Sequence, residues 1–579
     1  MRLTVVTMAF LIGAGSLMAA PLRELGRAER RWVDRTLARM TVEEKVGQML
    51  LPVSNGSYKP DSSEEWARIE HAIRDLHVGG YHTFGGDPAG TAVLLERMQR
   101  LSEVPLLITA DLEGGLGYVS RGATRLPLAM AIGATGNPDF ARRAGEIAAS
   151  EGRAVGIHVN YYPVVDVQNN PRNPIINIRS FGEDVESVSA MARAYIDGAQ
   201  SAGQIATAKH FPGHGDVAQD SHLELPVLKL DRERLERIEL PPFQAAIDSG
   251  VEAVMSAHIW VPAFEEREGI PSTLSRAVMT DLLRGEMGFE GLVFTDAMDM
   301  RGVSAHFEVG DATVRAIEAG ADVVIFPPDL DVAHAAVVAA VRSGRLSEAR
   351  LDTSVRRILE AKAKVGLHRG TGVDPLAVSS IVGSEAHRDA AQEMMDAAVT
   401  LVRNENGAVP LRGSEDMAVL HVNLLDRSTG WREGPVGNVF ADELRRRFPR
   451  TVTVQIDDRS GAEEIAAVRK MAQLADAVVV NGFIRVAAYK GSIDMTPGQL
   501  ELLRHMAGLE KPFVFTLFGS PYLLAAVPEL PSYILTYDTH PAAERAAVRA
   551  ITGEIPFRGK LPVSIPGLYP VGHGVAAAR

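Results

Sequence analysis

The chain has 579 residues, and because single hydrophobic cores stop growing near ~250–300 residues, we expect two domains. Its 46% apolar and 23% charged residues are typical of soluble globular proteins, and its net charge of −13 disfavours binding to nucleic acid phosphates. The absence of cysteine excludes disulfides, thiolate chemistry and a lipid-modified cysteine.

Residues 1–20 have the layout of a secretory signal peptide. Arg2 and the α-amine form a positive start, residues 3–17 are almost wholly apolar, and Ala19 and Ala20 are small residues suited to cleavage. An uncleaved membrane anchor is the alternative, although the apolar run is shorter than the ~20 residues that span a bilayer. We therefore expect export to the periplasm or the medium, with cleavage near Ala20 and no stable membrane insertion afterwards.

From residue 21 to 370, short apolar runs alternate with longer amphipathic stretches. The runs are Met49–Val53, Gly79–Phe84, Leu106–Ala110, Ile157–Val165, Ile205–Lys209, Ala253–Ala257, Gly291–Thr295 and Ala321–Phe326. The stretches between them include Glu64–Leu76, Asp139–Ala154, Val185–Ala202, Arg232–Ser249 and Arg276–Glu286. This α/β alternation predicts a parallel sheet, and eight repeats favour a closed (β/α)8 TIM-type barrel over an open doubly wound sheet.

Chemically capable residues follow several of these runs. They are Asp111, Asp166, Lys209 with His210, His258 and Asp296. Because active sites of such barrels form at the carboxyl ends of the strands, we expect these side chains to converge on one pocket.

Residues 371–394 are predicted to form a helical connection to a second α/β region at 395–579. Its expected strands are Ala418–Val422, Val452–Ile456, Ala477–Val480, Phe513–Leu517 and Tyr533–Thr536. The helical stretches between them, such as Ala462–Ala475 and Thr496–Ala507, predict a three-layer αβα sandwich.

The richest segment runs from Lys209 to Asp216 and is followed by Asp220-Ser221-His222. An aspartate two residues before a histidine suits a carboxylate–imidazole pair that transfers protons. Metal binding by the histidines and aspartates of this segment is an alternative, although their spacing matches no tight metal pattern, and a purely structural role is another.

Asp296, Asp111 and Arg179 are further candidates, for catalysis on a sugar or for its binding. Asp296 follows a predicted barrel strand, where a carboxylate can attack an anomeric carbon, and Asp299 is expected on the next helix turn as a cap or a surface charge. Asp111 and Arg179 are candidate ligands of sugar hydroxyls, with internal salt bridges as the alternative.

Together these segments resemble glycoside hydrolase family 3, within it the β-N-acetylglucosaminidase branch. The resemblance covers nearly the whole mature chain. It runs through Met40–Met49, Asp111–Gly115, Pro163–Val167, Arg179–Gly182, Lys209–Asp216 with Asp220–His222, Gly291–Met298, Ala398–Asn404 and Gly559–Ser564.

The resemblance implies a role for each candidate. Asp296 matches the nucleophile, and Asp220 and His222 match a dyad in which His222 is the general acid/base. Asp111, Arg179, Lys209 and His210 match residues that hold the hydroxyls of the terminal sugar. The implied enzyme is a retaining, exo-acting β-N-acetylglucosaminidase that uses no cofactor or metal and acts on peptidoglycan fragments or chitooligosaccharides.

One departure and several alternatives stay open. The family places an arginine about four residues after Glu-Gly-Gly, whereas here Leu116–Ser120 precedes Arg121, so the role of Arg121 is open. Family 3 β-glucosidases take their acid/base from the second domain and lack the Asp-Ser-His segment, so the second domain is expected to buttress the barrel or shape the acceptor side. A phosphorylase, a β-glucosidase, a non-catalytic sugar-binding protein and a metallohydrolase are the alternative functions, and the oligomeric state and natural aglycone are undetermined.

Overall fold

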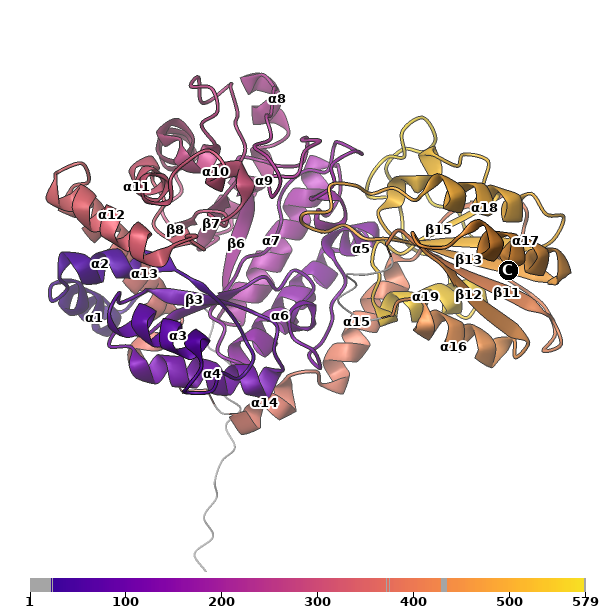
Figure 1. Ribbon diagram of the computed structural model, residues 1–579, viewed down its shortest axis with the longest axis horizontal. Helices are drawn as coiled ribbons and strands as arrows, with labels where there is room; N and C mark the ends of the chain where they lie inside the picture. The colour runs from indigo at the N-terminus through magenta and orange to yellow at the C-terminus, as the bar shows by residue number, and fades with distance from the viewer. Residues whose placement is uncertain (1–21, 23, 371, 374, 428–434, 577–579) are drawn as a thin grey trace, which may run out of the picture.

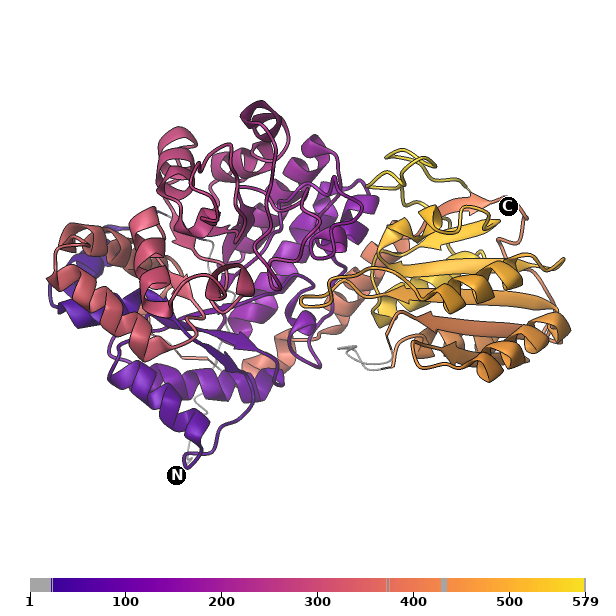
Figure 2. The same cartoon turned by 45° about the horizontal axis from the view of Figure 1, so that its top comes forward.

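The computed structural model describes residues 22–576 except 23, 371, 374 and 428–434. The predicted signal peptide, residues 1–20, therefore lies outside the described residues. The predicted fold class is confirmed, because a TIM-type barrel is followed by an αβα domain that lies against one side of it (Figures 1 and 2).

Among the described residues, nine short strands form the barrel wall. They are β1 (Leu50–Leu51), β2 (Val53–Asn55), β3 (Gly80–Phe84), β4 (Leu107–Ala110), β5 (Val159–Asn160), β6 (Ile205–Phe211), β7 (Ala253–Ser256), β8 (Leu292–Phe294) and β9 (Val324–Ile325). Strands β2 to β8 pair in chain order, β1 pairs with β9, and a bridge from Phe294 to Val323 joins β8 to β9. The sheet closes because β1 and β2 are consecutive, separated only by Pro52, which has no N–H to pair.

Helices surround the barrel, and most begin at a capping side chain. They include α1 (Arg27–Leu37), α2 (Val42–Gln48), α3 (Glu64–Arg74), α4 (Pro88–Leu101), α6 (Pro138–Ala154), α7 (Val185–Ser201), α11 (Val309–Ala319), α12 (Leu330–Arg342) and α13 (Glu348–Lys364). Ser63 accepts a hydrogen bond from the Trp66 N–H to start α3, and Asp184 does so from the Ser187 N–H to start α7. Within the described residues, no helix combines the length and apolar character needed to cross a bilayer.

Two predicted helices differ from the structure. Arg232–Ser249 is not one helix but two, α8 (Arg232–Arg237) and α9 (Pro241–Asp248), because Pro241 and Pro242 cannot continue a helix and instead begin a new one. Arg276–Glu286 is helical, but residues Ala277–Glu286 adopt the wider π form.

The second domain has a six-stranded sheet in the order β10-β15-β14-β13-β11-β12. Its strands are β10 (Thr400–Asn404), β11 (Val419–Leu425), β12 (Thr451–Ile456), β13 (Ala477–Ile484), β14 (Phe513–Gly519) and β15 (Ser532–Leu535). Strand β10, which the sequence analysis did not predict, runs antiparallel to β15 at one edge, and the other pairings are parallel. The sheet lies between α17 (Ala462–Leu474) with α18 (Pro497–Ala507) and α16 (Asn438–Arg447) with α19 (Pro541–Ile551) (Figure 1).

The two domains are joined by helices and by a shared core. Helices α14 (Pro375–Ile381) and α15 (Glu385–Ala398) form the connection. Leu128, Met130 and Ile178 of the barrel are buried in the same apolar cluster as the strands of the second domain. This continuous core fixes the second domain beside the carboxyl ends of the barrel strands.

Candidate active site

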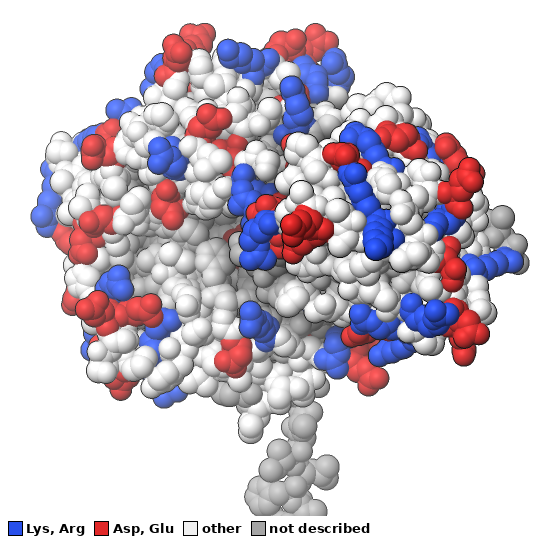
Figure 3. Space-filling view, turned by 45° about the vertical axis from the view of Figure 1, so that its right-hand side comes forward, with Lys and Arg blue, Asp and Glu red and all other residues white. Residues whose placement is uncertain are grey.

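A cavity of about 520 Å³ opens at the carboxyl ends of the barrel strands. Its lining includes all four predicted sugar ligands together with His222 and Asp296. The second domain contributes residues Ile484–Tyr489 and Thr539 to the same wall. Figure 3 shows a hollowed face on which Lys and Arg side chains are interspersed with Asp and Glu.

Four charged side chains form a network on the cavity wall. Lys209 Nζ lies 2.8 Å from both Asp111 Oδ1 and Glu113 Oε1. The Arg179 guanidinium makes a two-pronged contact with Glu113, through Nε at 2.9 Å and Nη2 at 2.8 Å. Although burial opposes ionisation, the charges of Arg179 and Lys209 hold the pKa of Glu113 well below its ordinary value. Glu113, which the sequence analysis did not select, is thus the counter-ion that fixes two predicted sugar ligands.

Replacing Glu113 with glutamine is expected to lower the free energy of unfolding at neutral pH by about 3–5 kcal/mol, because two buried cations lose their shared partner. Since folding lowers the pKa of Glu113, this stabilisation is present above the unfolded value of about 4.3 and is lost as the pH falls below it. Calorimetric unfolding of both proteins at pH 7 and in acid measures the difference. The exposed Glu290→Gln is the control, and equal stability of wild type and Glu113→Gln at pH 7 would contradict the prediction.

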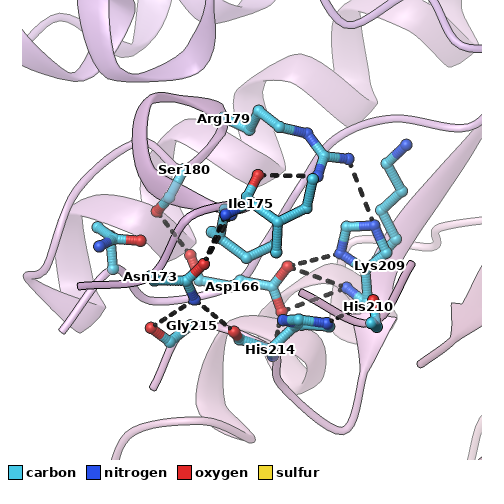
Figure 4. Close-up of polar contacts among 12 residues, drawn as sticks. Asp166, Asn173, Ile175, Arg179, Ser180, Lys209, His210, His214 and Gly215 are labelled. Carbon is cyan, nitrogen blue, oxygen red and sulfur yellow. Dashed lines mark hydrogen bonds and ion pairs between the residues drawn. The ribbon is translucent and has the colours of Figure 1, made fainter. Parts of the chain in front are cut away.

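Asp166 organises the loop that follows β6 (Figure 4). Its Oδ2 accepts a hydrogen bond from His210 Nδ1 at 2.7 Å, and its Oδ1 accepts one from the His214 backbone N–H at 2.7 Å. With Nδ1 bound to Asp166, the His210 ring directs Nε2 towards Arg179, whose Nη2 lies 3.5 Å away. Asp166 therefore lies beneath the cavity lining and orients His210, a role that a strand-end aspartate alone did not reveal.

The aspartate–histidine pair predicted from the sequence is formed. Asp220 Oδ1 lies 2.8 Å from His222 Nδ1 and also accepts the His222 backbone N–H at 2.9 Å. Asp220 Oδ2 accepts the backbone N–H of Tyr489, from the second domain, at 3.0 Å. Although burial opposes ionisation, hydrogen bonds from His222 and the Tyr489 N–H lower the pKa of Asp220. A carboxylate on Nδ1 leaves Nε2 of His222 as the nitrogen that can exchange a proton inside the cavity.

Asp296 lies two residues beyond β8 and lines the cavity. Its Oδ1 accepts the Ala297 N–H at 2.8 Å. Burial alone would raise its pKa, but His258, His210 and His222 outweigh it, so the pKa of Asp296 is lowered. His258 itself is buried behind the lining, with Nε2 2.9 Å from the Ala297 carbonyl. Asp299 lies not on a helix turn, as predicted, but in the turn before α10 (Arg301–Ser304), where it also lines the cavity.

The structure shows which arginine after Glu-Gly-Gly reaches the cavity. Arg121 is exposed and does not line the cavity, whereas Arg125 does. The Arg125 guanidinium lies over the Tyr118 ring at 4.9 Å, and its Nη2 is 3.4 Å from Asp538 of the second domain. The lengthened spacing after Glu-Gly-Gly put the role of Arg121 in question, but it did not point to Arg125.

The cavity brings together a carboxylate that can attack carbon, an imidazole that can transfer a proton and a set of charged hydrogen-bonding groups. This combination suits cleavage of a glycosidic bond. Within the described ranges, no group of three or more His, Asp or Glu side chains is arranged to hold a metal ion.

Comparisons with known proteins agree over both domains. Residues 41–361 match the glycosyl hydrolase family 3 N terminal domain, and residues 399–569 match the C-terminal domain of the same family. A Cellulomonas fimi protein named β-N-acetylglucosaminidase/β-glucosidase is 33% identical over 551 residues, which cover 92% of this chain and 95% of that protein. The solved structure of a family 3 β-N-acetylglucosaminidase from Paenibacillus sp. str. FPU-7 has a TM-score of 0.80 at 33% identity, over 91% of this chain and 99% of the other. A β-glucoside phosphorylase bound to 2FGlc has a TM-score of 0.84 at 27% identity, over 95% and 99%.

Proposed function

Because the chain belongs to glycoside hydrolase family 3, we propose that it is a retaining, exo-acting β-N-acetylglucosaminidase. The observation that carries the proposal is the Asp220–His222 dyad, which is supplied by a loop of the barrel and faces the cavity that Asp296 also lines. The barrel thus holds both a nucleophile and a proton donor for β-glycoside cleavage.

The proposed reaction has two displacements. Asp296 attacks the anomeric carbon while His222 Nε2 gives a proton to the leaving glycosidic oxygen. Water then attacks the glycosyl ester, with His222 as the base that takes its proton, and Asp296 leaves as the carboxylate. The lowered pKa of Asp296 supports its role because a nucleophilic carboxylate must be ionised at the pH of the reaction.

The terminal sugar is held by Asp111, Arg179, Lys209 and His210 in this proposal. Carboxylates and guanidinium groups bind paired hydroxyls because they present two acceptors or two donors at once. Arg179 and Lys209 are held by ion pairs with the buried Glu113 and not by surface contacts. Their positions are therefore set before the sugar binds.

The proposed substrates are peptidoglycan fragments or chitooligosaccharides, which the enzyme would encounter in the periplasm or the medium after its export. Support comes from the names of the Cellulomonas fimi and Paenibacillus relatives and from the signal-like layout of residues 1–20. No cofactor takes part, and a carbohydrate is the only proposed partner.

Phosphorolysis is the second candidate, favoured by the overall likeness to a β-glucoside phosphorylase. One experiment separates the candidates: release of chromophore from a β-N-acetylglucosaminide and from the matching β-glucoside, each with and without phosphate. We expect at least about a tenfold preference in kcat/KM for the acetamido sugar. A pocket that forms hydrogen bonds to the acetamido group leaves those partners unpaired when a glucoside, with a hydroxyl at that position, binds. We also expect no dependence on phosphate. Preference for the glucoside, or sugar phosphate as the product, would contradict the proposal.

A further inference from the structure

The loop that leaves β13 crosses from the second domain to the barrel. In Figures 1 and 2 this orange loop extends from the edge of the second domain towards the barrel. Its residues 484–489 line the cavity. Tyr489 itself has a positive φ of 62°, a conformation that non-glycine residues rarely adopt without support from their surroundings.

One buried ion pair holds the first part of this loop, from Arg485 to Lys490, before the chain continues to α18 at Pro497. Lys490 and Asp426 are in contact, and their side chains are 2% and 0% exposed. Asp426 Oδ2 also accepts the Arg485 backbone N–H at 2.9 Å, and Lys490 Nζ donates to the Arg485 carbonyl at 2.7 Å. Asp426 follows β11, so the pair connects the end of β11 to Arg485, which follows the neighbouring strand β13, and to Lys490.

The tip of the loop reaches the dyad. Tyr489, next to Lys490, donates its backbone N–H to Asp220 Oδ2, the oxygen that His222 leaves unoccupied. The Tyr489 ring lies edge-on to the His222 ring, with centroids 5.0 Å apart. The Asp220 side chain is 1% exposed, so this hydrogen bond is made away from solvent, where its loss is costly.

We propose that Asp426 and Lys490 are positioning residues for the general acid/base, acting through the Tyr489 N–H on Asp220. This proposal rests on the assignment of His222 as acid/base under the proposed function. Without the ion pair the loop loses the two anchors that keep Tyr489 in place, and Asp220 loses one of the bonds that fix the direction of the His222 ring. The second domain thereby controls proton transfer without supplying a group that touches the substrate's reacting atoms.

A purely structural role predicts a different outcome. Buried ion pairs contribute little net stability compared with apolar residues of the same volume, so stability alone does not explain the geometry of this one. A structural defect would lower turnover of all substrates together. Misplacement of a proton donor lowers kcat/KM, which reports the first displacement, only where the leaving group needs a proton.

The test is Lys490→Met, which keeps the length of the side chain and removes its charge. With a poor alkyl or sugar leaving group we expect kcat/KM to fall about tenfold to a hundredfold, part of the ~10²–10⁴-fold that a general acid contributes. With a dinitrophenyl leaving group, which departs without a proton, we expect less than about a threefold change. Lys490→Arg, which restores the charge, is expected to recover most of the loss.

Lys511→Met is the matched control. Lys511 is half-buried, and its Nζ also donates to several carbonyls, those of Ala472, Gln473 and Ala475, but it lies just before β14, at the opposite end of the strands from Lys490. Its removal is expected to leave the ratio between the two substrates unchanged. If Lys490→Met does not fold, Asp426→Asn carries the same prediction, because the amide oxygen can still accept the Arg485 N–H.

The decisive measurement is made again in a His222→Ala background. There Lys490→Met is expected to have no selective effect, because the donor it positions is absent. Equal losses on both substrates in the wild-type background, or an unchanged ratio in a folded variant, would overturn the inference. The proposed function fails separately, if wild type itself does not turn over β-N-acetylglucosaminides, and the ratios are then measured on whichever β-glycoside it cleaves.

Discussion

Asp296→Asn is expected to lower kcat by on the order of 10⁴–10⁶-fold, because an amide cannot form the glycosyl ester and no second group replaces the nucleophile. The variant should fold normally. The contact that the structure gives Asp296 is acceptance of the Ala297 N–H by Oδ1, and an amide oxygen accepts the same hydrogen bond. Initial rates on an activated β-N-acetylglucosaminide measure the loss, since with such a leaving group the nucleophile is still needed but the acid is not.

Asp299→Asn is the control, because it removes a carboxylate from the same cavity three residues later. Its loss is expected to be much smaller than that of Asp296→Asn. Mass spectrometry after reaction with a slow fluorinated substrate locates the covalent sugar. A sugar on another residue, or near-normal turnover by Asp296→Asn, would rule out Asp296 as nucleophile.

The architecture was predictable from the sequence because strand and helix periodicities alternate without long interruptions. Each of the eight apolar runs contains all or most of a barrel strand, and the run Met49–Val53 contains all of β1 and the start of β2. What failed were local details decided by single residues, such as the break at Pro241 and Pro242. The sequence analysis did not predict β10. This antiparallel edge strand directly follows a helix and stands outside the alternation of parallel strands and helices on which the prediction was based.

The site was predictable where a residue lies at the end of a barrel strand, as Asp111 and Asp296 do. Residues that act through contacts across the fold gave no such signal. Glu113 owes its role to Arg179 and Lys209, 66 and 96 positions away, and Tyr489 reaches Asp220 from the other domain. The sequence analysis assigned the second domain only a supporting or acceptor-side role because the Asp-Ser-His segment places the acid/base in the barrel. A backbone N–H of the second domain is nevertheless enough to bind the dyad.

His222→Ala is expected to lower kcat/KM by about 10²–10⁴-fold for substrates with poor leaving groups and to have little effect on those with activated ones. The reason lies in the direction of the ring. Because Nδ1 is bound to Asp220 at 2.8 Å, Nε2 is the nitrogen available to protonate the leaving oxygen. Kinetics on a series of aryl and alkyl β-N-acetylglucosaminides measure how strongly the rate depends on the acidity of the leaving group, and this dependence should steepen in the variant.

Asp220→Asn is a second variant that tests the Asp220–His222 dyad. The single amide oxygen can replace only one of the two Asp220 oxygens, so the backbone N–H of either His222 or Tyr489 loses its acceptor, and the negative charge beside the ring is removed. We therefore expect the same direction of change as for His222→Ala, with a smaller size. If both variants lose kcat/KM equally on activated and poor leaving groups, His222 does not act as the acid. The proton would then have to come from another group at the cavity, of which Asp299 is the nearest in sequence to the nucleophile.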